Sequence, residues 1–146
     1  MHSSRGPMAR CLLAAVSLTT LVALEAPATA WAWTTTFGHV GAADRTLRPG
    51  CHHYGYYYVV KSPSSDWFLE TWLYDPRGKP RGSGDFAPGS DPARGHTSFG
   101  ICRTTVVPGR FTIRARLTWY TPGLLPIDPP VEHRRWFEPA HFRLHR

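Results

Sequence analysis

Arg110-Phe111-Thr112-Ile113-Arg114-Ala115-Arg116-Leu117-Thr118-Trp119 carries the clearest structural signal in the chain. Apolar and polar residues alternate strictly along it, which is the period of a β-strand with one buried face. Phe111, Ile113, Ala115, Leu117 and Trp119 are expected to face a core, while the threonines and arginines between them face water. The segment therefore predicts a half-buried antiparallel strand.

Segments of similar character lie on both sides of this strand. Strands are predicted at residues 33–40, 54–61, 66–74, 96–103 and 136–145, and the segment 75–95 has room for one more short strand. Between Thr34 and Arg146 no apolar period of three to four residues lasts for three turns, so helices are not expected. Six or seven strands without helices predict an all-β, antiparallel β-sandwich.

The N-terminus has the features of an export signal. Arg5 and Arg10 precede an apolar run at 11–24, and Ala28-Thr29-Ala30 suits cleavage after Ala30. The apolar run is shorter than the roughly 20 residues of a spanning helix, which argues against a retained membrane anchor. We therefore expect residues 1–30 to be a cleaved signal peptide and the protein to be secreted.

The remaining residues, 31–146, have the size of a single domain. Of the three cysteines, Cys51 and Cys102 lie outside the signal, in a compartment where disulfides persist. They are predicted to form one disulfide bond. Cys51 begins the second predicted strand and Cys102 ends the fifth, so the pair would meet if these strands are antiparallel neighbours.

Two short motifs resemble secreted bacterial immunoglobulin-like or fibronectin-III-like domains. Pro108-Gly109-Arg110-Phe111-Thr112-Ile113 is similar to the turn and first half of their penultimate strand, and Asp75-Pro76-Arg77-Gly78 to a turn after the third strand. The resemblance would cover residues 33–145, and it implies an immunoglobulin-like fold without catalytic residues. The chain departs from antibody domains, because the Cys51–Cys102 bridge would lie within one sheet or at its edge.

Two segments are predicted as long loops. Residues 75–95 consist mainly of turn formers, and residues 121–135 carry four prolines around Leu124, Leu125 and Ile127. Loops on a rigid sheet often form binding sites. The three aliphatic side chains are expected to fold back onto the sandwich. The alternative is that they are exposed and bind a partner.

The segment 67–74 offers candidate binding residues. Its period of two separates Trp67, Leu69, Thr71 and Leu73 from a second set formed by Phe68, Glu70, Trp72 and Tyr74. We expect the first set to fill the core. Phe68, Trp72 and Tyr74 would then form an outer aromatic row able to stack on sugar rings or bury against a protein, unless a loop such as 121–130 covers them.

The charge of the chain favours anionic partners. Lysine and arginine outnumber aspartate and glutamate by 17 to 10, and nearly all of the basic residues are arginine. Acidic polysaccharide, teichoic-type polymers, lipid headgroups and nucleic acid would all suit this balance. The charges are scattered along the sequence, however, and a coding bias towards arginine explains them equally well; nucleic acid is the least expected of these partners.

The sequence contains no recognisable catalytic or metal-binding constellation. Neighbouring histidines such as His52 and His53 would point to opposite faces of a strand, and zinc-type Cys and His spacing is absent. Gly89-Ser90-Asp91 lacks the context of a nucleophile elbow. No metal, cofactor or catalytic residue is therefore predicted.

Together these features predict a secreted, non-enzymatic binding module. Its partner would be an envelope polysaccharide or a secreted or surface protein. Two alternatives stay open: a small hydrolase centred on Glu70, and an enzyme inhibitor that presents the loop 121–135.

Overall fold

The computed structural model describes residues 36–146, which form nine β-strands and no helix. The strands are β1 (Gly38–Gly41), β2 (Arg45–Thr46), β3 (Cys51–Val60), β4 (Trp67–Tyr74), β5 (Pro80–Phe86), β6 (Arg94–Cys102), β7 (Gly109–Thr121), β8 (Val131–Trp136) and β9 (Ala140–His145). The predicted signal peptide, residues 1–30, lies outside the described residues. The prediction of an all-β chain is confirmed.

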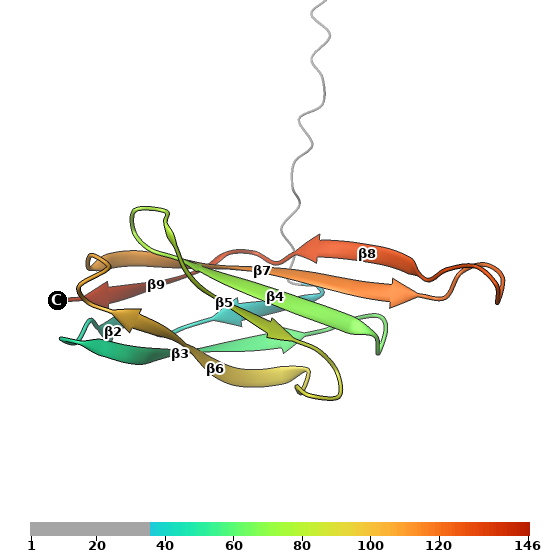
Figure 1. Cartoon of the computed structure of the whole chain (residues 1–146), viewed down its shortest axis with the longest axis horizontal. Coiled ribbons are helices and arrows are strands. Elements are labelled where there is room, and N and C mark those ends of the chain that lie inside the picture. The colour runs from blue at the N-terminus through green and yellow to red at the C-terminus, as the bar shows by residue number, and fades with distance from the viewer. Residues whose placement is uncertain (1–35) are drawn as a thin grey trace, which may run out of the picture.

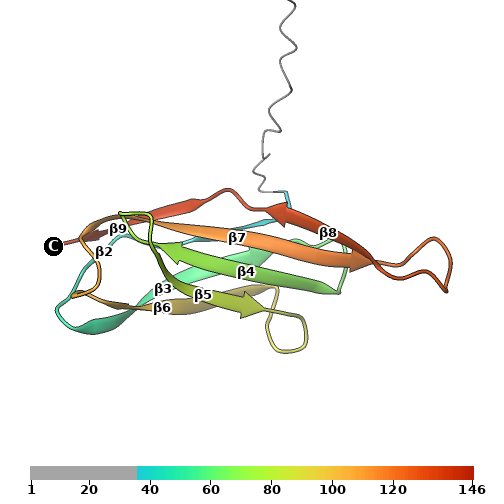
Figure 2. The ribbon, with the colours of Figure 1, turned by 45° about the horizontal axis from the view of Figure 1, so that its top comes forward.

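The strands form two sheets (Figure 1). The small sheet has the order β1-β3-β6, and the large sheet has the order β2-β9-β7-β4-β5, with β8 also paired to β7. β7 is the spine of the large sheet: residues 109–113 pair with β9, residues 112–119 pair with β4, and residues 116–121 pair with β8. The two sheets form two layers, which Figure 2 shows from a turned viewpoint.

Most predicted strands are present with shifted ends. β4 and β7 differ from the predicted 66–74 and 110–119 by at most two residues, and β5 occupies the short strand allowed within 75–95. β1 overlaps the first predicted strand, 33–40, at residues 38–40, and residues 36 and 37 form a turn before it. The strand count rises to nine because β2 and β8 were not expected.

The predicted boundary near residue 136 is wrong. The segment 121–135 was expected to be a loop and 136–145 a single strand. Instead, β8 begins at Val131, and the strand structure is interrupted between Trp136, the end of β8, and Ala140, the start of β9. The break has a physical reason: Phe137 is fully buried, and Pro139 has no backbone N–H for a ladder. β8 escaped detection because Val131-Glu132-His133-Arg134-Arg135-Trp136 shows no apolar alternation.

The core lies between the two sheets. Phe111, Ile113, Ala115 and Leu117 of β7 are fully buried, which confirms the inward face predicted from the alternation. The small sheet contributes Tyr54, Tyr56, Tyr58 and Val60 from β3, together with Phe99 and Ile101 from β6.

Glycines in β5 and β6 allow the tyrosines of β3 to pack closely. A Cβ atom at Gly84 would lie 2.8 Å from the Tyr56 hydroxyl, and one at Gly95 would lie 2.5 Å from that of Tyr58. Tyr56 stacks on Phe99 with ring centroids 4.3 Å apart. Strand glycines thus appear here where an aromatic ring needs their space.

One hydrogen bond joins the two sheets through the core. The Tyr56 hydroxyl and Thr71 Oγ1 are 2.8 Å apart, and Thr71 also donates to the Gly84 carbonyl at 3.1 Å. Burial raises the pKa of Tyr56 to about 12, so this hydroxyl stays protonated.

We expect Tyr56→Phe to lower the free energy of unfolding by about 1 kcal/mol, because it removes this bond and keeps the ring. A double-mutant cycle with Thr71→Val, measured by urea unfolding, isolates the pairwise energy. A coupling energy near zero would show that the bond adds nothing to the packing of the two sheets.

The predicted disulfide bond is present. Cys51 and Cys102 face each other directly in the register of β3 and β6, with Cα atoms 3.9 Å apart. The bridge therefore lies within the small sheet, where the first strand residue of β3 meets the last of β6. Within residues 36–146, no helix is long and apolar enough to span a membrane.

Candidate functional site

β4 divides its side chains between the core and the outer face of the large sheet. Trp67, Leu69, Thr71 and Leu73 are buried, as the alternation predicts. On the outer face, the Phe68 side chain is 37% exposed, and Trp72 and Tyr74 are half-buried.

β7 places a row of arginines beside these aromatic residues. In the register of β4 and β7, Trp72 faces Arg114 and Glu70 faces Arg116. Further along the same face, Arg110 of β7 faces Arg143 of β9. We call this surface the arginine–aromatic face, and it consists of Phe68, Trp72, Tyr74, Arg110, Arg114, Arg116, Trp136 and Arg143.

Trp136 was not predicted as part of this surface. It lies opposite Arg116 in β8, and its ring centroid is 5.5 Å from that of Trp72. The Arg114 guanidinium lies 4.8 Å from the centre of the Trp136 ring, and that of Arg116 lies 5.5 Å from the Trp72 ring, both within reach of a cation–π attraction. The partial cover of Trp72 thus comes from β8 and β7, rather than from the loop 121–130.

Arg110 and Arg143 are directly opposite each other on adjacent strands, and both are exposed. Asp44 lies beside them, because its Oδ1 accepts the Arg143 amide at 2.7 Å and it lines a pocket together with both arginines. Among the described residues, neither guanidinium has a carboxylate oxygen within 4.0 Å. Like charges in this position repel and destabilise a sheet. A bound anion would relieve the repulsion.

His141 lies next to this pair on β9. Its ring Nδ1 is 3.0 Å from Thr112 Oγ1. Burial and the neighbouring Arg110 charge hold the pKa of His141 below its ordinary value. The neutral imidazole therefore leaves the positive charge here to the arginines.

Glu70, the candidate acid of a hydrolase, is held by an arginine. Both Nε and Nη2 of Arg116 donate to Glu70 Oε2, at 2.8 Å and 2.5 Å. Asp85 of β5 lies directly opposite Glu70, so the structure supplies the second carboxylate that the sequence did not identify. The ion pair of Glu70 with Arg116 joins β4 to β7 on this face.

Basic residues scattered in the sequence gather at one end of the molecule. This end holds the disulfide, the start of β7 and the C-terminus (Figure 1). Of the lysines and arginines among residues 36–146, more than half lie here: Arg45, Arg48, Arg77, Lys79, Arg81, Arg103, Arg110, Arg143 and Arg146. Among the described residues, Asp44 and Asp75 are the carboxylates at this end, and Asp75 is paired with Arg81.

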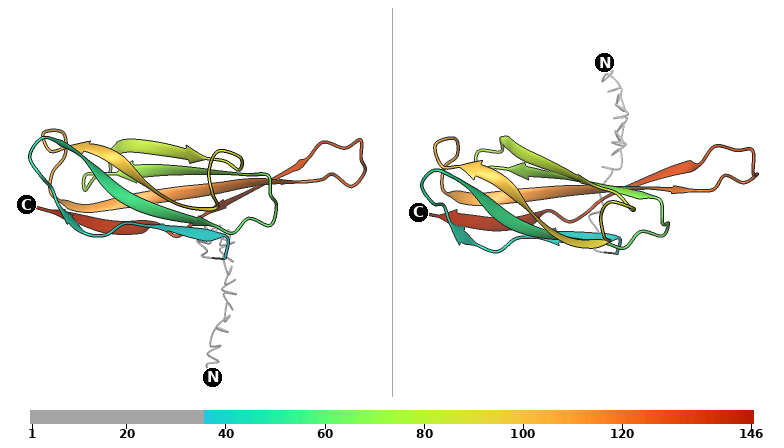
Figure 3. Two further views of the ribbon diagram at one scale, coloured as in Figure 1. Left: turned by 90° about the horizontal axis from the view of Figure 1, so that it is seen from below. Right: turned by 60° about the horizontal axis from the view of Figure 1, so that its bottom comes forward.

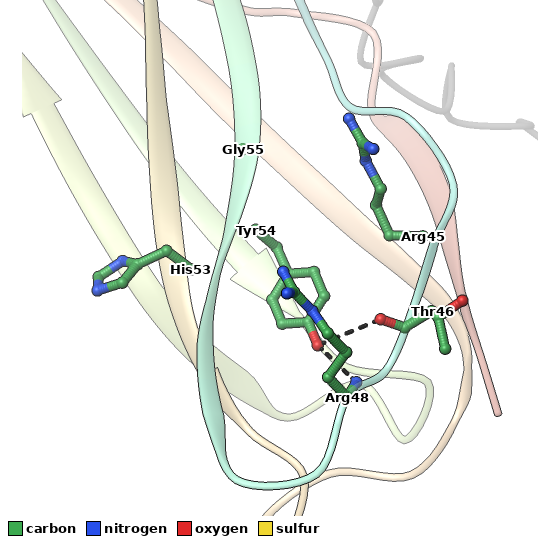
Figure 4. Close-up of a pocket in the computed structure, with 6 residues that line it drawn as sticks. All are labelled: Arg45, Thr46, Arg48, His53, Tyr54 and Gly55. Atoms are coloured by element: carbon green, nitrogen blue, oxygen red, sulfur yellow. Dashed lines mark hydrogen bonds between the residues drawn. The ribbon is translucent and has the colours of Figure 1, made fainter.

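A pocket of about 490 Å³ opens at the same end, between β2 and β3. Arg45, Thr46, Arg48, His53, Tyr54 and Gly55 line it (Figure 4). Tyr54 links the two sides of the pocket. Its hydroxyl accepts a hydrogen bond from the Arg48 amide at 3.0 Å and donates one to the Thr46 carbonyl at 3.4 Å. His53 points away from Tyr54 on the other side of β3. The lining includes two arginines and no carboxylate.

Histidines approach one another on the outer face of the small sheet without forming a metal site. The rings of His39 and His96 lie on either side of Tyr57, at centroid distances of 5.8 Å and 6.1 Å. The described residues contain no group of three or more His, Cys, Asp or Glu side chains placed to hold a metal ion.

No protein-family model matches the sequence, and a search of curated proteins finds no significant match.

Proposed function

We propose that this protein is a non-enzymatic binding module that holds an acidic envelope polysaccharide on the arginine–aromatic face. The observation that carries the proposal is the Arg110–Arg143 pair: two exposed arginines face each other in the register of β7 and β9, and neither guanidinium forms an ion pair among the described residues. Opposite charges at directly opposed positions stabilise a sheet, whereas like charges destabilise it. The one carboxylate nearby, Asp44, accepts the Arg143 amide and does not balance two arginines, so the site keeps a net positive charge that suits an anion from outside the molecule.

The neighbouring aromatic side chains support a sugar rather than a small inorganic anion. Phe68, Trp72 and Tyr74 lie on the same face as the arginines, and aromatic rings provide flat apolar area with few rotatable bonds. Arginine recognises carboxylate and phosphate groups through paired hydrogen bonds. A polymer that alternates sugar rings with such groups fits both parts of the face.

The direct test is the binding of polygalacturonate, an acidic polysaccharide, and of neutral dextran to the protein purified after export. Removing both exposed guanidinium groups with Arg110→Ala/Arg143→Ala is expected to weaken polygalacturonate binding at least about tenfold, or about 1.4 kcal/mol. The matched control Arg94→Ala/Arg135→Ala removes the same charge from outside this face and should bind within about twofold of the wild type. Affinity should fall as salt rises from low to high concentration, because exposed charges are screened.

The same variants separate loss of binding from loss of folding. Arg110→Ala/Arg143→Ala should unfold at the same or a slightly higher urea concentration than the wild type, because it removes a repulsion. Equal weakening by both double variants would reduce the interaction to non-specific attraction and overturn the proposal. Trp72→Ala is expected to weaken binding in a way that salt changes little.

A hydrolase centred on Glu70 is the alternative that this experiment also tests. If the wild type releases reducing ends from polygalacturonate and Glu70→Gln does not, the protein is a hydrolase rather than a binding module. If the protein is a binding module, neither the wild type nor Glu70→Gln releases reducing ends, because Glu70 binds Arg116 and takes part in no reaction.

Secretion and the immunoglobulin-like topology belong to the same proposal. The disulfide bond is compatible with an oxidising compartment, and β3 and β6 are antiparallel neighbours, as the second and fifth strands of such a sheet would be. An export assay of the full chain, with mass measurement of the released product, tests cleavage after Ala30.

A further inference from the structure

The β7–β8 hairpin extends beyond the rest of the large sheet as an arm. β7 and β8 remain in register from Arg116↔Trp136 to Thr121↔Val131, whereas the pairing of β7 with β4 ends at Trp119. Figure 3 shows the arm projecting at the end opposite the C-terminus in both views. The loop 122–130 forms its tip.

The tip exposes a cluster of aliphatic side chains. Leu124, Leu125 and Ile127 are 99%, 60% and 89% exposed, which contradicts the expectation that they fold back onto the sandwich. The contradiction has a geometric reason: the arm carries the loop past Trp67, the first residue of β4, so no core surface lies beneath it. Isolated exposed apolar residues are ordinary, but three within four positions of one tip mark an interaction surface.

The loop is held in one shape before any partner arrives. The Asp128 amide donates to the Leu125 carbonyl, and the Leu125 amide donates to Asp128 Oδ2, both at 2.9 Å. The four prolines of the loop, at 122, 126, 129 and 130, have fixed φ angles and no N–H group. Little ordering entropy and few backbone donors are therefore left to oppose burial of the tip.

The charges around the tip identify the kind of surface that it fits. Asp128 directly follows the aliphatic cluster and its carboxylate contacts the Leu125 amide, while Glu132 lies four positions further along, in β8, and is ion-paired with Arg134. Insertion into a bilayer would draw the Asp128 carboxylate towards hydrocarbon and anionic headgroups, both unfavourable. An apolar protein pocket with a basic rim matches both the cluster and the carboxylates.

We propose that the tip of the β7–β8 arm docks Leu124, Leu125 and Ile127 into an apolar pocket of a protein partner whose rim carries lysine or arginine side chains. Each side chain that becomes fully buried contributes about 1.5–3 kcal/mol. The site is separate from the arginine–aromatic face, so the protein would bind a polymer on its sheet and a protein at its tip.

Site-specific photo-crosslinking tests this surface. The probe is the exported protein carrying a benzophenone maleimide on Leu124→Cys, irradiated with the intact exporting cells and their medium. Ser90→Cys, on an exposed loop away from the tip, carries the same label as a matched control. We expect Leu124→Cys to give a discrete protein adduct, absent with Ser90→Cys, whose crosslinked peptide lies among apolar residues flanked by basic ones.

Removal of the two carboxylates supplies the decisive second arm. Asp128→Asn/Glu132→Gln keeps a side-chain oxygen at position 128 to accept the Leu125 amide. Added to the labelled protein, it should reduce the adduct at least about tenfold although Leu125 and Ile127 remain. An undiminished adduct in this variant would contradict the proposal that lysine or arginine side chains line the rim of the partner's pocket. Crosslinking to lipid only, crosslinking to a second copy of this chain, or no adduct at all would overturn the proposal as a whole. Since polygalacturonate binding is measured independently, the two proposals can fail separately.

Discussion

Replacing Cys51 and Cys102 together by serine is expected to lower the free energy of unfolding by about 4 kcal/mol. The bridge joins residues 51 positions apart, and in the chain-entropy picture a closed loop of this length constrains the unfolded chain by about that amount. Neither cysteine is buried, so serine is accommodated without a cavity. Because domains of this size are stable by only about 5–15 kcal/mol, the loss is a large part of the total.

The measurement is urea unfolding of the double variant beside the wild type, with and without reductant. Reduced wild type should unfold with the midpoint of the double variant, and reductant should leave the double variant unchanged. Equal midpoints for the oxidised wild type and the double variant would show that registered pairing of β3 and β6 alone holds this end together.

Replacing Asp75 by alanine is expected to cost about 3 kcal/mol, because it removes a buried carboxylate that organises the turn between β4 and β5. Asp75 Oδ1 accepts the amides of Arg77 and Lys79, both at 2.9 Å. Asp75 Oδ2 accepts Nε and Nη2 of Arg81 at 2.8 Å and 2.6 Å. The variant would leave two amides and the partly buried Arg81 guanidinium without this acceptor.

The contribution of Asp75 should depend on pH in a definite direction. Burial alone raises the pKa of Asp75, but the hydrogen bonds from Lys79, Arg81 and Arg77 outweigh it, so the pKa lies below its ordinary value. A lowered folded-state pKa stabilises the protein above the unfolded value of about 3.9, and this stabilisation is lost as pH falls through the folded value.

Asp75→Asn provides the matched comparison. The stability gap between wild type and Asp75→Asn, from urea unfolding at several pH values, should be constant near neutrality and shrink below about pH 4. A gap that is the same at every pH would mean that shape rather than charge at this position stabilises the turn.

The sequence was informative wherever one face of a strand is buried. The alternation in β7 and β4 predicted both the strands and the side chains that fill the core, because the period of two is imposed by the pleat. The disulfide pairing followed from the number of cysteines left after the signal. These features depend on neighbours along the chain or on simple counting.

Features that depend on distant strands could not be read from the sequence. β8 is an edge strand that pairs with residues 116–121 of β7 and buries none of its residues fully, so its sequence carries no apolar alternation to detect. Trp136 contacts Trp72 although the two residues are more than sixty positions apart in the sequence, and Arg110 faces Arg143 only through the β7–β9 register. The exposure of the tip likewise follows from features that the sequence did not predict: the extension of β7 to Thr121, the strand β8, and the register of β7 with β4.

The net positive charge of the described residues is concentrated at the disulfide end, because at the opposite end Asp128 and Glu132 of the arm are balanced by Arg134 and Arg135. Near a polyanionic surface such an uneven charge distribution experiences a torque as well as an attraction. The molecule would therefore turn before it touches, with its C-terminal end towards the surface and the arm away from it. Orientation would be settled during the approach, and whatever the arm contacts would meet it pointing outward.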